Sequence, residues 1–210
     1  MESSNFLDAN KNQLYPVFLK LDHLRILLVG AGNVGLEKLT SLLSNSPFAN
    51  ITVVAPLVKE EIRTLLLKHQ SCSIIERSFE RGDIENKELI FLATDNPSLH
   101  EDIKKLAAEK GILVNVADTP GLCDFYLGSI VQKGSLKIAI STNGKSPTIA
   151  KRIKEIINEL LPDDIDSVLD NMQVIRNRMK GDFKEKIRQL NELTSALVAE
   201  NELLESNKEI

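Results

Sequence analysis

Hydrophobic residues gather in short runs along the first 120 positions of the chain, and segments with helical spacing separate these runs. Residues 24–29 (Leu-Arg-Ile-Leu-Leu-Val) form a nearly unbroken apolar run, which is typical of a central parallel strand covered on both faces. Further strands are expected at residues 51–54, 73–76, 89–93 and 112–116. A helix is expected from Leu36 to Asn45, and Asn96-Pro97 is typical of an N-cap followed by the first helical residue. This alternation predicts an α/β fold with a doubly wound parallel sheet.

The pattern changes in the second half of the chain. Residues 136–140 form another strand-like run, and Ser146 is suited to cap a helix that begins at Pro147. A break at residues 162–164 precedes two amphipathic helices, the first ending at Gly181 and the second carrying a stripe that extends to Leu197. Their apolar stripes are expected to pack against the main body or a partner subunit, and not to form a ligand site.

A glycine motif links the first strand to the first helix. Gly30 allows a tight turn out of the strand, Gly32 lets backbone amides approach a pyrophosphate, and Gly35 permits close packing of the helix on the strand. With Asn33 and Val34 between them, these residues predict a Rossmann-like dinucleotide site, because the helix N-terminus favours negative charge.

The residues at the end of the second strand, which usually select between NAD and NADP, do not decide between them here. The second strand is expected to end at Val54-Ala55-Pro56, with neither an acid for the ribose hydroxyls nor an arginine for a 2'-phosphate. These residues therefore do not separate NAD from NADP. The other candidate cofactor contacts are Pro56, Leu57, Thr94 and Asp95. For Asp95, a polar contact to the nucleotide and a place in the turn before Pro97 both remain open.

One stretch of the chain carries positive charge without any acid. Between Phe125 and Lys154 there are six cations and no Asp or Glu: Lys133, Lys137, Lys145, Lys151, Arg152 and Lys154. The net charge of the chain is -4, but the local field and not the net charge governs encounter with a charged partner. This stretch therefore points to a surface that binds a polyanion. Asp118 lies just upstream, at the expected carboxyl end of a strand, where such sheets bind ligands. A strand-end turn and a solvated basic face are the alternative interpretation.

Composition excludes several classes of protein. The chain of 210 residues has no Trp and only two Tyr, so stacking on nucleic acid bases is not expected. Cys72 and Cys123 show neither disulfide nor zinc-site spacing, and His23, His69 and His100 show no ligand spacing. The first twenty residues lack the apolar run typical of a signal peptide, and no run of 18 apolar residues occurs, so a cytoplasmic protein without a membrane partner is expected.

Several motifs together resemble a known family. They occur in the order and spacing found in the dehydrogenase/ferrochelatase part of siroheme synthases: residues 30–35, 93–95 (Ala-Thr-Asp), 115–118 (Asn-Val-Ala-Asp) and 141–147 (Ser-Thr-Asn-Gly-Lys-Ser-Pro), preceded by 15–19 (Tyr-Pro-Val-Phe-Leu). The resemblance spans residues 14–162. It implies oxidation of precorrin-2 to sirohydrochlorin with NAD, and in many members insertion of Fe2+ to give siroheme. It also implies a homodimer formed largely by the region after the nucleotide-binding domain.

The resemblance assigns roles to individual residues. The family's key aspartate falls on Asp118, the candidate base for dehydrogenation and a transient ligand for the metal. Ser141 and Thr142 stand where a pair of serines is familiar, and with Lys145 and Lys151 they are the candidates for binding the tetrapyrrole, which is a polycarboxylate.

The sequence predicts three parts. Residues 1–113 form the NAD-binding Rossmann domain, residues 114–148 a small α+β dimerisation and active-site region, and residues 149–210 a helical C-terminal tail. At 210 residues the chain resembles a stand-alone form without a methyltransferase domain. Two alternatives stay open: a dehydrogenase without chelatase activity, and a regulatory module that senses NAD. Fe2+ and Co2+ also remain alternatives for the metal.

Overall fold

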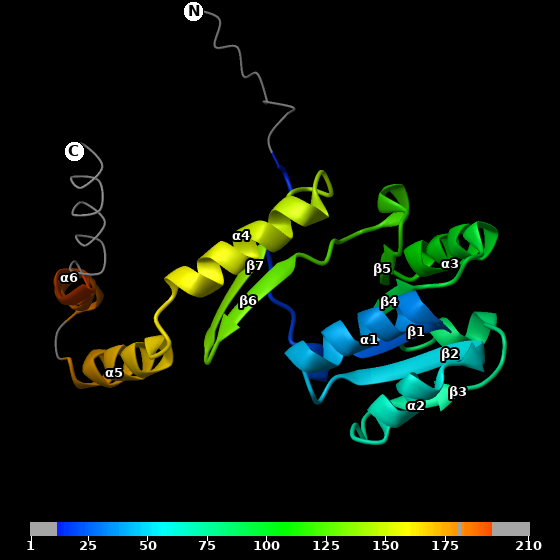
Figure 1. Ribbon diagram of the computed structural model, residues 1–210, viewed down its shortest axis with the longest axis horizontal. Coiled ribbons are helices and arrows are strands. Elements are labelled where there is room, and N and C mark those ends of the chain that lie inside the picture. Colours follow the sequence, from blue (N-terminus) through cyan, green and yellow to red (C-terminus); the bar gives the residue numbers. More distant parts are fainter. Residues whose placement is uncertain (1–11, 180–181, 195–210) are drawn as a thin grey trace, which may run out of the picture. The chain divides into compact units, whose positions relative to one another are not determined.

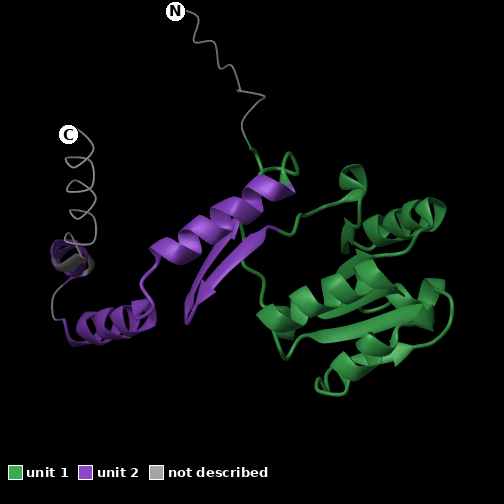
Figure 2. Cartoon of the chain, in the orientation of Figure 1, with its two compact units in different colours: residues 1–127, 141–146 green, residues 128–140, 147–210 purple. Residues whose placement is uncertain are grey.

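The structure, a computed structural model, describes residues 12–179 and 182–194. The chain divides into two compact units (Figure 2). The first comprises residues 1–127 and 141–146, and the second comprises residues 128–140 and 147–210. The three-part division predicted from the sequence stays a prediction.

A five-stranded parallel sheet forms the centre of the first unit (Figure 1). The strands are β1 (Arg25–Ala31), β2 (Asn50–Val58), β3 (Ser73–Ile75), β4 (Leu89–Leu92) and β5 (Leu113–Val116). Their order is β3-β2-β1-β4-β5, and each neighbouring pair is parallel. This is the order of a mononucleotide-binding half of the Rossmann fold with two further strands, so the predicted fold class is confirmed.

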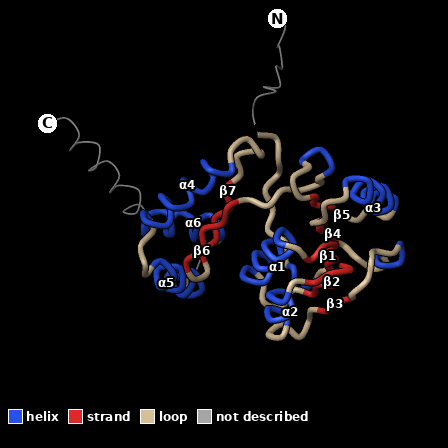
Figure 3. The backbone as a smooth tube through the Cα atoms, turned by 45° about the vertical axis from the view of Figure 1, so that its right-hand side comes forward, coloured by secondary structure: helices blue, strands red, loops and turns tan. Residues whose placement is uncertain are grey.

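Helices cover both faces of this sheet, as Figure 3 shows. On one face, α1 (Asn33–Asn45) and α2 (Glu60–Leu66) share a hydrophobic core with β1 and β2. On the other face, α3 (Pro97–Glu109) buries Ile103 and Ala107 against β4 and β5. Short 3-10 helices lie at Leu21–His23, Arg81–Ile84 and Pro120–Leu122. Because both faces are covered, six of the seven residues of β1 are buried, as its apolar run predicts.

The N-terminus of α3 follows the sequence prediction in detail. The Asn96 side chain accepts a hydrogen bond from the Leu99 backbone N-H at 3.1 Å, and Pro97 occupies the first helical position. This cap satisfies one of the donors that a helix start leaves unpaired. The helix start is thereby fixed directly after β4, next to Thr94 and Asp95.

In its described residues, the second unit contains a hairpin and three helices. Strands β6 (Ser129–Lys133) and β7 (Leu136–Ile140) pair antiparallel, and α4 (Pro147–Leu160) packs against them. The two remaining helices are α5 (Ile165–Arg178) and α6 (Phe183–Thr194). Asp166 in the first turn of α5 accepts a hydrogen bond from the Ser135 N-H at 2.6 Å, so the hairpin turn holds the start of α5.

The apolar pattern of the sequence predicts no strand at β6 and gives no bounds for a helix at α2. In β6 only Val131 is buried, and in α2 only Ile62 and Leu66 are buried, so neither segment shows a long apolar pattern. The predicted helix end at Gly181 and the predicted stripe residue Leu197 lie outside the described residues. Within the described part of the chain, no helix has the length and hydropathy needed to span a membrane.

We expect Gly35→Ala to destabilise the first unit. A Cβ atom at position 35 would lie 2.3 Å from the backbone oxygen of Gly30, a distance that forces α1 away from β1. Such overpacking should lower the free energy of unfolding by about 2 kcal/mol or more, measured by urea denaturation.

Gly82→Ala provides the matched control, because a Cβ atom at Gly82 has no heavy atom within 4 Å. This variant should change the free energy of unfolding by less than about 1 kcal/mol. Equal effects of the two substitutions would contradict the close helix-to-strand packing.

Candidate active site

The glycine turn brings the backbones of three elements together. Gly30 has a φ of 104°, and a Cβ atom there would lie 2.4 Å from the backbone oxygen of Ala93 at the end of β4. The start of α1 packs on the same turn through Gly35. Only glycine fits at both positions, so the turn, α1 and the end of β4 are held at a fixed spacing.

This turn has the features that a dinucleotide needs. A Cβ atom at Gly32 would meet no heavy atom within 4 Å, so the backbone lies open to a ligand there. The first turn of α1 contains no acid, and no side chain caps it. Its N-H groups are therefore available to a pyrophosphate, and the residues present fit the cofactor that the glycine motif implies.

A pocket of about 230 Å³ lies at the carboxyl ends of β4 and β5. Eight residues line it: Val34, Thr94, Asp95, Pro97, His100, Ala117, Asp118 and Thr119. The structure thus brings together four residues that the sequence analysis selected, because Val34, Thr94, Asp95 and Asp118 share one pocket. The three elements that carry them meet at the sheet edge where α/β proteins bind ligands.

Hydrogen bonds between neighbouring strand ends fix the floor of this pocket. The Ala93 N-H donates to the Val29 oxygen at 2.8 Å, and the Ala117 N-H donates to the Leu92 oxygen at 2.9 Å. These bonds extend the strand ladder of β1, β4 and β5 by one residue. Asp118 therefore follows directly after the last residue that the sheet holds.

Asp118 itself has an unusual backbone conformation. Its φ is 57°, in the left-handed region that non-glycine residues adopt only at a cost. The Cys123 thiol lies beneath this turn and accepts from the Val116 N-H at 3.2 Å, while the Thr119 hydroxyl donates to the Ala117 oxygen at 3.3 Å. The turn is thus tied on both sides of Asp118, whose side chain is exposed to the pocket.

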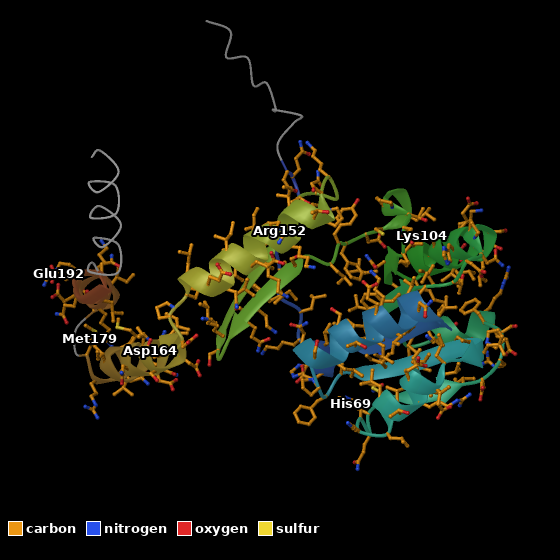
Figure 4. All side chains as sticks on the ribbon, viewed as in Figure 1. His69, Lys104, Arg152, Asp164, Met179 and Glu192 are labelled. Atoms are coloured by element: carbon orange, nitrogen blue, oxygen red, sulfur yellow. The ribbon has the colours of Figure 1, made fainter. Side chains whose placement is uncertain are left out.

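Asp124, the next carboxylate along the chain after Asp118, has a structural role. It forms an ion pair with Lys104 of α3, which Figure 4 labels, and it accepts from the Val114 N-H at 2.8 Å. Buried Asn115 donates to the Phe125 oxygen at 2.8 Å and so holds the same segment against β5. Both contacts anchor the loop after Asp118, so of the two carboxylates that follow β5, Asp118 and not Asp124 lines the pocket.

His100 is a pocket residue that the sequence analysis did not select. It is 4% exposed, and its Nε2 atom lies 2.8 Å from the Thr94 hydroxyl oxygen. Burial lowers the pKa of His100 below its ordinary value, although Asp95 acts in the opposite direction. A signal exists in the sequence, since His100 shares a helix face with buried Ile103 and Ala107.

The other selected residues lie elsewhere. Pro56 and Leu57 are exposed near the end of β2, outside the pocket. Asn33 accepts a hydrogen bond from the Lys59 ammonium at 2.7 Å, and Lys59 is a second residue that the sequence analysis missed. Because β2 extends to Val58, Lys59 and not Pro56 follows its carboxyl end.

The loop at residues 141–146 uses its hydroxyl groups on its own backbone. Ser141 Oγ accepts from the Asn143 N-H at 3.2 Å, and the Thr142 hydroxyl both donates to the Ser146 oxygen and accepts from the Ser146 N-H. Thr142 therefore shapes the loop that presents the exposed Lys145.

Two of the six cations in the acid-free stretch have partners close by. The Lys133 ammonium binds Asp163 at 2.9 Å, and Arg152 of α4, labelled in Figure 4, binds Glu155 at 2.7 Å. Lys145 and Lys151 are exposed, and within the described residues neither forms an ion pair. Within the same residues, no group of three or more metal-binding side chains occurs.

Comparisons with known proteins agree with the fold. Residues 17–129 match a family described as putative NAD(P)-binding, and residues 133–160 match the central part of sirohaem biosynthesis proteins. A siroheme synthase from Psychrobacter cryohalolentis is 35% identical over 173 residues, which are 82% of this chain and 32% of that protein. One from Vesicomyosocius okutanii is 31% identical over 188 residues, 88% of this chain and 40% of that protein.

A solved structure extends the comparison to three dimensions. SirC, a precorrin-2 dehydrogenase, has a TM-score of 0.68 and 26% sequence identity, and the match covers 94% of this chain and 100% of SirC. Fold and site together define a Rossmann-type NAD(P)-binding protein. The chain belongs to the family described as putative NAD(P)-binding, and its later part matches the central part of sirohaem biosynthesis proteins. It spans about a third of the length of the siroheme synthases it matches.

We expect acid to destabilise the protein through His100. Because burial lowers its pKa in the folded state, the unfolded chain takes up this proton first as the pH falls. The contribution is neutral above pH 6.5, the ordinary value, and becomes destabilising below it. His100→Gln should therefore show a smaller loss of unfolding free energy between pH values above and below 6.5, measured by urea denaturation.

His23→Gln is the control, since the side chain of His23 is 68% exposed. It should retain the pH dependence of the unmodified protein. If His100→Gln retains it too, His100 is not the group that titrates.

Proposed function

We propose that this chain oxidises precorrin-2 to sirohydrochlorin with NAD as hydride acceptor and then inserts Fe2+ to give siroheme. The observation that carries the proposal is the pocket that joins Asp118 to Thr94, Asp95 and the glycine helix through Val34. The likeness to SirC, named as a precorrin-2 dehydrogenase, supports the first step.

Dehydrogenation divides between the cofactor and the chain. When bound, NAD supplies the hydride acceptor. Removal of a hydride from the macrocycle must be accompanied by loss of a proton, and the Asp118 carboxylate is the base that accepts it. The left-handed turn fixes Asp118 directly after the carboxyl end of β5, where its side chain lines the pocket.

Insertion of iron uses the same carboxylate. The reaction removes two pyrrole protons, and a ligand must pass Fe2+ to the macrocycle. The Asp118 carboxylate at the pocket offers an oxygen ligand suited to such a transfer. Asp118 is therefore proposed as both base and transient ligand.

Capture of the tetrapyrrole is assigned to the loop at residues 141–146 and to the start of α4. Precorrin-2 is a polycarboxylate, so exposed ammonium groups are suitable partners. Lys145 and Lys151 meet this requirement, and Ser141 and Thr142 hold the loop in shape.

The same proposal includes a homodimer in the cytoplasm. Four large apolar side chains form a stripe on α4 at positions i, i+4, i+7 and i+11: Ile149, Ile153, Ile156 and Leu160. Their exposed fractions range from 36% to 76%, and a second copy of the chain would cover them. Cys72 and Cys123 are free thiols, which fits a reducing compartment.

An anaerobic assay tests the enzymatic proposal. Purified protein is mixed with precorrin-2 and NAD, the formation of NADH and the macrocycle spectrum are followed, and Fe2+ is then added. We expect NADH with a sirohydrochlorin spectrum, and then a metal-dependent change faster than in a control without protein. NAD binding without NADH formation would instead favour the NAD-sensing module, and NADH without the second change would identify a dehydrogenase alone.

Asp118→Asn should lower the rate of dehydrogenation by at least about a hundredfold while NAD binding persists. Asparagine tolerates the left-handed backbone, so the substitution removes the base without disturbing the turn. Asp102→Asn on the exposed face of α3 is the matched control and should leave the rate unchanged. A rate near that of the unmodified enzyme in Asp118→Asn would refute the catalytic role.

Ile156→Glu tests the homodimer. Burial of an unpaired carboxylate in an apolar interface should weaken self-association by about a hundredfold, measured by sedimentation velocity across a range of protein concentrations. Asn158→Glu introduces the same charge at an exposed position two residues away, which lies on the opposite side of α4. Equal sedimentation of the two variants would exclude the stripe as the dimer interface.

A further inference from the structure

The carboxyl end of β2 differs from the usual dinucleotide site. β2 pairs with β1 in a register that shifts, since Val29 faces Val54 whereas Ala31 faces Val58. Two extra residues on β2 therefore bulge from the ladder, and the strand ends two residues later than its apolar pattern predicts. Lys59 is the residue that emerges from this strand end.

Lys59 contacts the glycine turn through both its backbone and its side chain. Its N-H donates to the Ala31 oxygen at 3.2 Å, and its ammonium donates to Asn33 Oδ1 at 2.7 Å. Asn33 is the first residue of α1. The Lys59 ammonium is thus held beside the helix N-terminus that the pyrophosphate requires.

In this fold, the residue after the second strand reads the ribose of the adenosine. An acid there binds the 2'-hydroxyl of NAD, and a cation accommodates the 2'-phosphate of NADP. Residues 54–59 contain no acid, and Leu57 is 84% exposed. The only charge in this segment is the ammonium of Lys59.

We propose that Lys59 is a 2'-phosphate site, so that the chain accepts NADP as well as NAD. The proposal rests on the cofactor site of the proposed function and adds the group that recognises the ribose. Glu61 lies 3.4 Å from the Lys59 ammonium and competes with the phosphate for it. We therefore expect the site to bind NAD and NADP with similar affinity and not to be restricted to NADP.

Isothermal titration calorimetry at low ionic strength, where screening is weak, measures the affinities. NAD and NADP are titrated first, followed by adenosine 2',5'-bisphosphate and AMP, which isolate the 2'-phosphate. NADP should bind within about tenfold of NAD, and the bisphosphate should bind more tightly than AMP. Binding needs no turnover, so the result does not depend on precorrin-2.

Three substitutions locate the effect. Lys59→Gln keeps a hydrogen-bond donor but removes the charge, and it should raise the ratio of the dissociation constants of NADP and NAD by at least about tenfold. Glu61→Gln removes the competing carboxylate and should lower this ratio. Lys105→Ala removes an exposed cation from α3 and should leave the ratio unchanged.

The outcomes separate this proposal from the one on which it rests. If NAD binds and NADP does not, or if Lys59→Gln leaves the ratio unchanged, the 2'-phosphate site is refuted while the dehydrogenase proposal stands. If neither dinucleotide binds, both proposals fail. Loss of NADP binding in Lys59→Gln alone, with Lys105→Ala unaffected, supports the assignment.

Discussion

The contact between Gly35 of α1 and the backbone of Gly30 is the constraint on which the rest of the site depends. A side chain at either position would push into backbone oxygen atoms, so α1 and the ends of β1 and β4 approach only because both residues lack Cβ. That approach places the N-terminus of α1 at the carboxyl edge of the sheet, where Val34 lines the pocket. The glycine motif thus first permits close packing of α1 on β1 and β4, and the anion-binding site at the start of α1 follows from that packing.

A second constraint brings distant residues together at this edge. Thr94 and Asp118 are far apart in the sequence, yet each directly follows a residue whose N-H is hydrogen-bonded to the adjacent strand. Ala93 donates to Val29 of β1, and Ala117 donates to Leu92 of β4. Parallel strands of matched register end at one level, so the residues after them converge without any contact of their own. The left-handed turn at Asp118 is held by Cys123 and Thr119, and the surrounding fold offsets its strain.

The sequence predicts the parts of the fold that repeat a strong pattern. Strands β1, β4 and β5, helix α3 and its Asn96 cap follow from apolar runs and cap chemistry. Four of the eight pocket residues follow because motifs at strand ends converge. The parts that escape prediction carry weak local signals. β6 has one buried residue, α2 has two, and the extension of β2 to Val58 depends on a bulge that only pairing with β1 reveals. Lys59 was missed for that reason.

The charge of a surface is likewise only partly predictable from the sequence. A stretch without acids need not be a stretch of free cations, because a neighbour in space can lie beyond its ends in the sequence. Asp163 and Glu155 follow the acid-free stretch and bind Lys133 and Arg152, so the field at its surface is smaller than a residue count implies. Four cations of the stretch form no ion pair within the described residues: Lys137, Lys145, Lys151 and Lys154. The proposed capture of a polycarboxylate by Lys145 and Lys151 uses two of these four. Lys145, Lys151 and Lys154 are exposed, so within the described residues they have no ion pair to break when an anion approaches, and this favours binding over internal pairing.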